Sequence, residues 1–170
     1  MTKAKDFLAA LRSQQIAQPG SAEEYWKRQQ SMWLDDLSML RDSIRQWMSP
    51  VVEDHSATIE DRVFSTMEPD LGRYDAPGLE FVLLMEPPQV VLVRPRGLRV
   101  VGVVETGGSR VVGASGRVDL ECGVKREIVL RFRKDDRTTW YSFSAGKKRE
   151  LDEDVFFDLL ARTTDIRTAS

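Results

Sequence analysis

The sequence predicts an α+β fold with an N-terminal helical hairpin (a short helix followed by a long one), an antiparallel β-meander or partly open barrel of about six to eight strands, and a C-terminal helix. Three observations predict it. Apolar residues recur every three or four positions in residues 1–50, alternate in short runs separated by turns in 51–149, and return to helical spacing in 150–163. At 170 residues, 41% of them hydrophobic, the chain is expected to form a single domain spanning residues 1–170, with 164–170 as a tail.

The first helix is expected over residues 3–15, because four apolar residues fall on one face of a helix there. These residues are Ala4, Phe7, Leu8 and Leu11. Pro19 and Gly20 then break the helical pattern. Directly after them, Ser21 and Glu24 have the spacing of a capping box, in which each side chain accepts a hydrogen bond from the other residue's backbone N–H. A second helix is therefore expected to begin here.

A 3.5-residue apolar repeat defines this second helix, which is expected over about residues 23–49. The repeat consists of Trp26, Trp33, Leu37, Leu40, Ile44, Trp47 and Val51. Pro50 is expected to end the helix, because a proline pushes the residue before it out of the helical region. A narrow stripe of this kind can bury against a sheet, and it also leaves open a homodimer through the 23–49 helix.

Residues 51–149 have the pattern of consecutive short strands joined by turns. The expected strands are 58–67, 79–85, 89–94, 98–105, 110–112, 118–122, 127–133 and 138–144. Residues 67–78 contain many turn formers and are expected to be a loop, and residues 146–149 are expected to be a basic turn. Connections this short cannot contain crossover helices, so neighbouring strands must run antiparallel.

The last helix is expected to begin after Asp152, whose carboxylate can accept a backbone N–H of the first turn. Glu153 and Asp154 place negative charge in that turn, where the helix dipole favours it. The buried stripe of this helix is expected to consist of Val155, Phe156, Leu159 and Leu160.

Charge is segregated along the chain, although the formal net charge is only -2. Residues 51–88 hold two basic and nine acidic side chains, whereas residues 89–149 hold fourteen basic and six acidic ones. The two segments can neutralise each other across one folded surface, or they can leave a patch of one sign that meets an oppositely charged partner.

Composition and the lone cysteine indicate a cytoplasmic protein. No apolar run reaches the length of a membrane span, and the first residues lack the apolar stretch of a secretory signal, so no membrane partner is expected. Cys122 is the only cysteine and cannot form an internal disulfide, as is usual in a reducing compartment.

Catalytic chemistry has few candidates in this sequence. A structural zinc site needs four nitrogen or sulfur ligands, and only His55 and Cys122 are available. Cys122 lies on the apolar phase of its strand, so a thiolate activated by His55 is not expected. Residues 108–115 have the glycine spacing of a phosphate-binding loop, but Ala114 occupies the position of its lysine. The sequence therefore predicts no catalytic residue, no metal site and no cofactor.

Arginines and one tyrosine on the predicted sheet or its turns are the candidate partner-binding residues. They are Arg94, Arg96, Arg99, Arg131, Arg133 and Tyr141. Arginine is a frequent anchor of protein interfaces, and an aromatic ring beside arginines could also stack on a nucleic-acid base.

Acidic and basic residues also alternate on two of the predicted strands. Asp119 and Glu121 share the outward phase of the first strand. Glu127, Arg131 and Arg133 share the outward phase of the second. If the two strands are neighbours, these side chains are expected to form a lattice of cross-strand ion pairs.

These features favour a non-enzymatic protein-interaction protein that acts by covering a protein partner, as an immunity-type, toxin- or defence-associated, adaptor or chaperone protein would. Two other functions stay open. The first is a nucleic-acid-binding regulator that uses the arginine-bearing sheet face, although a sequence pI of about 5.6 is low for a protein that relies on phosphate contacts. The second is a metal-dependent enzyme built on the carboxylates of Asp119, Glu121 and Glu127.

Overall fold

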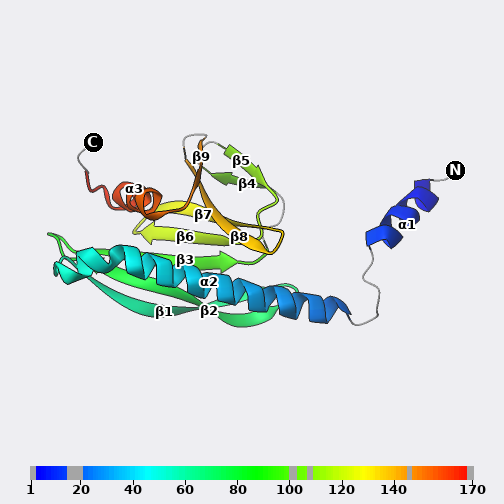
Figure 1. The fold of residues 1–170 in the computed structure, drawn as a ribbon, viewed down its shortest axis with the longest axis horizontal. Helices are drawn as coiled ribbons and strands as arrows, with labels where there is room; N and C mark the ends of the chain where they lie inside the picture. Colours follow the sequence, from blue (N-terminus) through cyan, green and yellow to red (C-terminus); the bar gives the residue numbers. More distant parts are fainter. Residues whose placement is uncertain (1–2, 15–20, 100–102, 107–108, 145–146, 168–170) are drawn as a thin grey trace.

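The computed structural model describes residues 3–14, 21–99, 103–106, 109–144 and 147–167. Within these ranges the chain forms three helices and nine strands (Figure 1). They are α1 (Lys3–Gln14), α2 (Ser21–Glu53), β1 (Ala57–Glu68), β2 (Gly72–Leu83), β3 (Gln89–Gly97), β4 (Val103–Thr106), β5 (Ser109–Val112), β6 (Arg117–Cys122), β7 (Lys125–Lys134), β8 (Arg137–Ser144), β9 (Lys147–Glu150) and α3 (Glu153–Thr164).

Seven strands form one antiparallel sheet in the order β1-β2-β3-β6-β7-β8-β9, with β1 and β9 at its two edges. β4 and β5 form a separate hairpin that is inserted between β3 and β6. Apart from this insertion, every strand pairs with its neighbour in sequence, so the sheet is an open meander. The predicted α+β class and antiparallel meander are confirmed.

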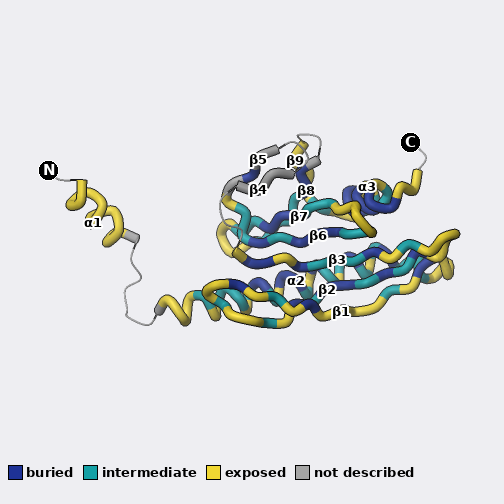
Figure 2. Tube along the Cα trace, turned by 180° about the vertical axis from the view of Figure 1, so that it is seen from behind, coloured by how far each residue is buried: buried dark blue, intermediate teal, exposed yellow. Residues whose placement is uncertain are grey.

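α2 and α3 pack against the same face of the sheet and enclose the main core, as Figures 1 and 2 show from opposite sides. The predicted apolar stripe of α2 supplies one wall of this core: Trp33, Leu37, Leu40 and Ile44 are buried, together with Met48. They meet buried residues of β2 and β3, such as Phe81 and Val91. Each fully buried side chain of this size contributes about 1.5–3 kcal/mol. A homodimer through the 23–49 helix remains a prediction, and it would have to use the side of α2 that faces away from the sheet.

α2 continues past Pro50 to Glu53, so the expectation that Pro50 ends the helix was wrong. The Asp54 N–H donates to the Pro50 carbonyl at 3.1 Å and closes the last turn. The proline costs one backbone hydrogen bond, whereas the turn after it lets Val51 and Val52 pack against the core. Burial of these two side chains offsets the local cost.

The expected loop at residues 67–78 is mostly strand. β1 and β2 form a long hairpin in which Glu68 lies opposite Gly72 and Val63 lies opposite Pro77. β3 pairs only with the second half of β2, from Leu79 onward, so Pro77 lies where β2 has one neighbour and its missing N–H interrupts no second ladder. The turn-forming residues therefore lie in the half of β2 that pairs with β1 but not with β3.

Two further boundaries differ from the expectation, and one prediction falls on a side chain that is not described. The basic segment 147–150 is the edge strand β9 and not a turn, because it pairs with β8. The expected strand 98–105 is divided: β3 ends at Gly97 and β4 begins at Val103, and residues 100–102 lie outside the described residues. The Ser21 side chain of the predicted capping box also lies outside the described side chains.

α3 matches its prediction closely. The Asp152 carboxylate accepts the Val155 N–H at 2.8 Å, as expected of an N-cap. The four residues of the predicted stripe are all buried. The helix ends at Thr164, and Asp165 follows it in a left-handed conformation.

α1 is present over almost the predicted residues, but it does not pack on α2 as the second arm of a hairpin. It lies apart from the rest of the molecule in Figure 1, and Figure 2 shows it exposed along its described length. Phe7, Leu8 and Leu11 are 66%, 48% and 42% exposed. The sheet already buries the apolar stripe of α2, so the side of α2 away from the sheet offers α1 only separate apolar side chains such as Met39.

Candidate interaction surface

Arg131 lies on the helix-facing side of β7 and is fully buried. Its guanidinium contacts the Asp36 carboxylate of α2, with distances of 2.8 Å from Nε and 2.6 Å from Nη2 to Oδ2. Nη1 donates to the Ser115 carbonyl at 2.7 Å, and the guanidinium lies over the Trp33 ring. Burial lowers the pKa of the Arg131 guanidinium, and the hydrogen bond to Asp36 opposes that effect. Arg131 therefore holds α2 to the sheet, and none of it reaches the surface.

Arg133 joins the same carboxylate from the next position on that side of β7. Its Nη1 lies 2.9 Å from Asp36 Oδ2 and 2.9 Å from Thr138 Oγ1, and the Thr138 hydroxyl donates to Asp36 at 2.8 Å. The expectation that Arg131 and Arg133 face outward was wrong, because Val129 of the same phase lies in the core under the helices. Alternation alone does not say which phase a covering helix will occupy.

Arg94 and Arg96 lie on the opposite face of the sheet, where they form an ion-pair lattice with β6. Arg94 Nε lies 3.0 Å from Glu121 Oε2, and Arg96 pairs with both Glu121 and Asp119. Arg117 makes two hydrogen bonds to the Asp119 carboxylate, at 2.8 and 3.0 Å. The lattice expected from the alternation exists, but with partners from β3 and β6. These arginines are largely neutralised and offer little free positive charge.

The three carboxylates considered for a metal-dependent enzyme do not converge. Asp119 and Glu121 are engaged with arginines, whereas Glu127 lies on the helix-facing side of β7, with Oε1 3.4 Å from Arg162 Nε. Among the residues that the structure describes, no group of three or more histidine, cysteine or acidic side chains could hold a metal ion. This geometry lends no support to the carboxylate hypothesis.

Arg99 lies beside a buried carboxylate that the sequence did not single out. Glu68 accepts the N–H groups of Leu98 at 3.1 Å and Arg99 at 2.7 Å, and it also accepts the Tyr74 hydroxyl. Trp33 Nε1 donates to the same hydroxyl at 3.1 Å. Burial and the nearby carboxylate raise the pKa of Tyr74. The network fastens the end of β3 to β1, and Glu68 was missed because residues 67–78, which include it, were expected to be a loop.

The cations of the basic segment, residues 89–149, pair mostly with carboxylates outside the acidic segment, residues 51–88. The Arg99 guanidinium pairs with Asp70, which links the basic segment to the acidic one, and it also lies over the Trp26 ring. Other cations of the basic segment pair within it, as Arg94 does, with α3, as Arg149 does, or with Asp36 of α2, as Arg131 and Arg133 do. The two segments therefore do not cancel each other across one surface, and the outer strands β7–β9 keep a basic excess.

Tyr141 belongs to an aromatic cluster on the face of the sheet away from the helices. Its ring meets that of Phe132 edge to face with centroids 5.6 Å apart, and both pack near Phe143. Lys148 of the edge strand places Nζ 4.1 Å from the Tyr141 ring centroid and 5.5 Å from that of Phe132. A hollow of about 800 Å³ at the end of the β7–β8 hairpin is lined by both rings and by Lys148, Lys134 and Arg137. We name these five residues the aromatic–cation surface.

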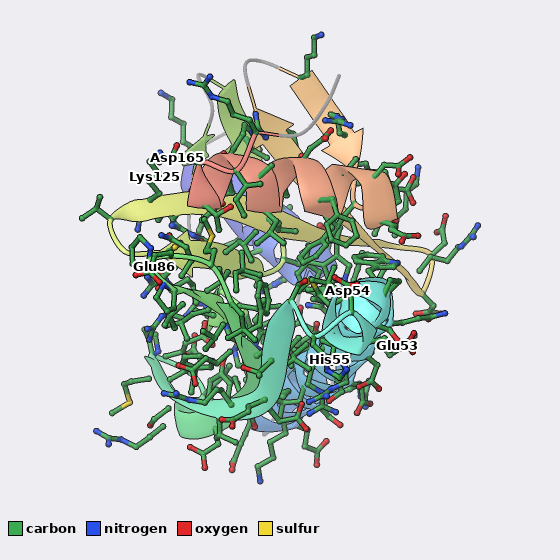
Figure 3. The ribbon with its side chains drawn as sticks, turned by 90° about the vertical axis from the view of Figure 1, so that its left-hand side faces the viewer. Glu53, Asp54, His55, Glu86, Lys125 and Asp165 are labelled. Carbon is green, nitrogen blue, oxygen red and sulfur yellow. The ribbon has the colours of Figure 1, made fainter. Side chains whose placement is uncertain are left out.

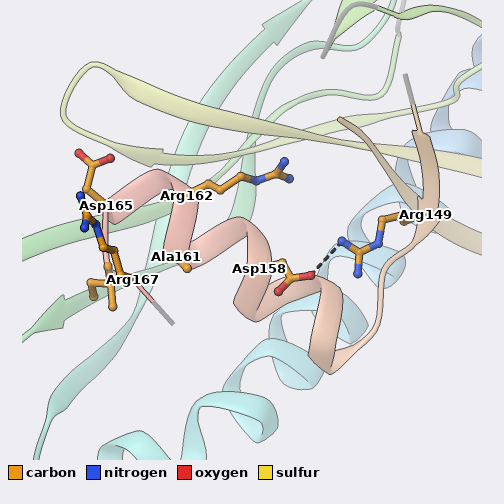
Figure 4. Close-up of a pocket in the computed structure, with 7 residues that line it drawn as sticks. Arg149, Asp158, Ala161, Arg162, Asp165 and Arg167 are labelled. Carbon is orange, nitrogen blue, oxygen red and sulfur yellow. Dashed lines mark hydrogen bonds and ion pairs between the residues drawn. The ribbon is translucent and has the colours of Figure 1, made fainter. Parts of the chain in front are cut away.

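A second hollow, of about 560 Å³, lies beside the end of α3 (Figure 4). Three arginines line it, but Arg149 is paired with Asp158 at 2.9 Å, and Arg162 Nε lies 3.4 Å from Glu127 Oε1. Asp165, also in the lining, pairs with Lys125. Two of the three arginines are therefore paired with carboxylates, so this hollow is a weak candidate for an anion site.

His55 and Cys122 both lie at the ends of secondary-structure elements, His55 directly after α2 and Cys122 at the end of β6. His55 takes a φ of 60° after α2, and the N–H groups of His55 and Ser56 donate to the carbonyls of Val52 and Val51, a Schellman termination. Figure 3 shows His55 at the end of α2, away from the Lys125–Asp165 pair near α3.

The Cys122 thiol lies in the strand turn beside Lys125 and donates to Gln89 Oε1 at 3.2 Å. Burial raises the pKa of this thiol, and the charge of Asp165 adds to the effect. The thiol therefore stays protonated, which is unfavourable for a nucleophile.

No protein family, curated protein or solved structure matches this chain. In the part of the chain that the structure describes, no helix combines the length and apolarity that crossing a bilayer requires.

Proposed function

We propose that this is a non-enzymatic cytoplasmic adaptor that acts by covering a protein partner, and that α1 is the segment that enters the partner. One observation carries the proposal: the apolar stripe of α1, formed by Phe7, Leu8 and Leu11, is exposed and lies away from the sheet and its helices. The lone cysteine supports the cytoplasmic assignment.

A helix of this length is marginal in water unless its apolar face is covered. Isolated helices shorter than about 12–15 residues are barely stable, and α1 has 12 residues. Covering Phe7, Leu8 and Leu11 would contribute up to about 1.5–3 kcal/mol for each side chain. Docking therefore stabilises the helix and supplies affinity at the same time.

Charge specifies the kind of groove. α1 carries Lys3, Lys5 and Arg12 against a single acidic residue, Asp6. A basic amphipathic helix fits a groove with an apolar floor and an acidic rim. The partner is therefore a protein with such a groove, and immunity, defence-associated and chaperone proteins all belong to the class that acts by this kind of occlusion.

The test compares two triple variants of the full chain, tagged at the C-terminus. In the first, Phe7, Leu8 and Leu11 are changed to Ser. In the matched control, Ala9 and Ala10 are changed to Ser and Ser13 is changed to Ala; these residues lie toward the other side of the helix, and the changes keep the net charge of α1. Proteins cross-linked in the native host at physiological salt are quantified by mass spectrometry.

The proposal expects at least one protein that the wild type and the control recover equally and that the first variant recovers at least tenfold less. Both variants should unfold within about 0.5 kcal/mol of the wild type, because α1 does not pack on the body. Equal recovery of every protein by the two variants would refute the proposal. A separate measurement of binding to lipid vesicles would refute it too, if the first variant loses vesicle binding and still recovers every protein.

A further inference from the structure

The aromatic–cation surface presents two ring systems from adjacent strands on one side of the sheet. Phe132 of β7 and Tyr141 of β8 lie in diagonal register, since Tyr141 pairs with Leu130 and Phe132 with Thr139. Both rings are half-buried, so their inner edges are held by packing while the outer parts line the hollow. Rings fixed in this way do not lose side-chain entropy when a planar ligand stacks on them.

The cations of this surface are available to a ligand. Lys134, Arg137 and Lys148 are exposed, and none of them forms an ion pair with any other residue in the described ranges. This distinguishes them from Arg94 and Arg96, whose guanidinium groups are engaged by carboxylates.

Two carboxylates, Asp135 and Glu150, also line the hollow, so the excess of positive charge is small. The fourth cation in the lining, Arg133, already pairs with Asp36. Binding must then depend on the rings as well as on charge, because this many cations alone would hold an anion weakly.

We propose that the aromatic–cation surface binds single-stranded nucleic acid, with a base stacked on Tyr141 and the flanking phosphates held by Lys148, Lys134 and Arg137. Lys148 covers the Tyr141 ring with a flexible, exposed side chain, so a base can take its place while the ammonium moves to a phosphate. Stacking on an aromatic side chain is tolerant of sequence, since every base has a flat face.

A single strand fits this surface better than a duplex does. Rings that lie on a sheet can reach only unstacked bases, and in a duplex the base faces are covered by their neighbours. An acidic peptide would use the three cations but would gain little from two ring faces. The two rings therefore favour a single strand over a duplex or an acidic peptide, and the experiment compares these three ligands.

The test measures fluorescence anisotropy of labelled 12-nucleotide oligo(U) and oligo(dT), a 12-base-pair duplex and polyglutamate, each with the full chain. At low salt we expect the single strands to bind at least tenfold more tightly than the duplex or polyglutamate. Three phosphate contacts predict a slope of about -2 for log K against log salt concentration. The oligo(U) and oligo(dT) arms show whether the sugar contributes.

The variants separate stacking from charge. Tyr141→Leu should weaken single-strand binding at least fivefold and leave the salt slope nearly unchanged. Lys134→Gln with Arg137→Gln should reduce the slope by about 1.4 units. Arg73→Gln removes one positive charge at an exposed position of β2 outside this surface; it is the control for loss of charge elsewhere and should leave affinity within twofold. Lys148→Glu, a change at an exposed edge position, should weaken binding without affecting folding.

Several results would overturn the proposal. These are no single-strand binding at about 50 mM salt, equal losses in the Arg73→Gln control, or polyglutamate binding that matches that of oligo(U) and survives Tyr141→Leu. The α1 variant with Phe7, Leu8 and Leu11 changed to Ser should bind oligo(U) like the wild type, so this result is independent of the proposed partner binding.

Discussion

Arg131 and Asp36 lie 95 positions apart in the sequence and form a buried ion pair with Nη2 and Oδ2 2.6 Å apart. The pair lies between α2 and β7, beside the fully buried Trp33 ring. A charged contact in this place sets how α2 lies across the sheet, because the apolar contacts around it have little directional preference.

Removal of Arg131 should therefore leave the buried Asp36 carboxylate with less positive charge beside it. We expect Arg131→Met to lower the free energy of unfolding by about 3 kcal/mol, somewhat moderated because Arg133 and Thr138 still contact Asp36. Urea denaturation of Arg131→Met, Asp36→Leu and the double variant measures the coupling. The double variant should lose less than the sum of the single losses, whereas strictly additive losses would contradict a coupled pair.

The raised pKa of Tyr74 predicts an alkaline loss of stability. In the unfolded chain a tyrosine ionises near pH 10, whereas in the folded state the buried hydroxyl keeps its proton to higher pH. The stabilisation is complete below about pH 10 and is lost as the pH rises above it, because there the unfolded state binds fewer protons.

Guanidinium denaturation between pH 7 and pH 11 measures this effect. Tyr74→Phe should cost about 1–2 kcal/mol at pH 7, because Glu68 and Trp33 Nε1 each lose a partner, and it should flatten the decline above pH 10. Tyr25→Phe, at an exposed site on α2, is the control and should keep the wild-type slope. An unchanged alkaline slope in Tyr74→Phe would show that Tyr74 is not the cause.

Gly78 is required by a close approach between β2 and its surroundings. A Cβ at this position would lie 2.4 Å from the Val93 carbonyl oxygen and 2.5 Å from the Phe64 ring. Gly78→Ala should therefore destabilise the protein by about 3 kcal/mol or more, because the nearest obstacle is backbone. At Gly72 a Cβ would meet nothing within 4 Å, so Gly72→Ala should cost only the strain of its φ of 68°, about 1–2 kcal/mol. Thermal unfolding of the two variants compares the steric cost at Gly78 with the backbone strain at Gly72. Equal losses of stability would contradict the close contacts at Gly78.

His55 terminates α2 at a positive φ that suits glycine better than histidine. His55→Gly should raise the free energy of unfolding by about 0.5–1 kcal/mol, whereas the β-branched His55→Val should lower it by at least about 1 kcal/mol. Chemical denaturation of the two variants measures both effects. If both variants destabilise the protein equally, the imidazole itself makes a contribution that the backbone conformation does not explain.

The sequence pattern was sufficient wherever a structural feature depends on near neighbours. Asp152 caps α3 through Val155, three residues away, and the stripe of α3 is buried as its spacing predicts. The antiparallel order of the strands followed from short connections. The end of α2 at Glu53 was not predicted, because Pro50 was expected to end the helix. Val51 and Val52 pack on the core, whose other residues come from distant strands, and this packing outweighs the local preference of proline.

The candidate residues were harder to place, since a strand's alternation gives two phases without saying which one a helix will cover. Arg131 and Arg133 were assigned to the outer side for this reason, and Phe132 between them was not recognised as a surface residue. One position decides the face, so an error of a single residue moves every side chain of the strand.

The amino-acid sequence was enough to establish which segments are helical, the antiparallel connectivity of the strands, and that the chain has one histidine and one cysteine. Only the folded arrangement decided that Asp36 would neutralise Arg131, that Glu68 would bind the end of β3, and that Lys148 would cover Tyr141. The first group depends on residues within a few positions of one another. The second depends on pairs brought together from distant strands and helices, whose distances follow from the packing of the whole sheet.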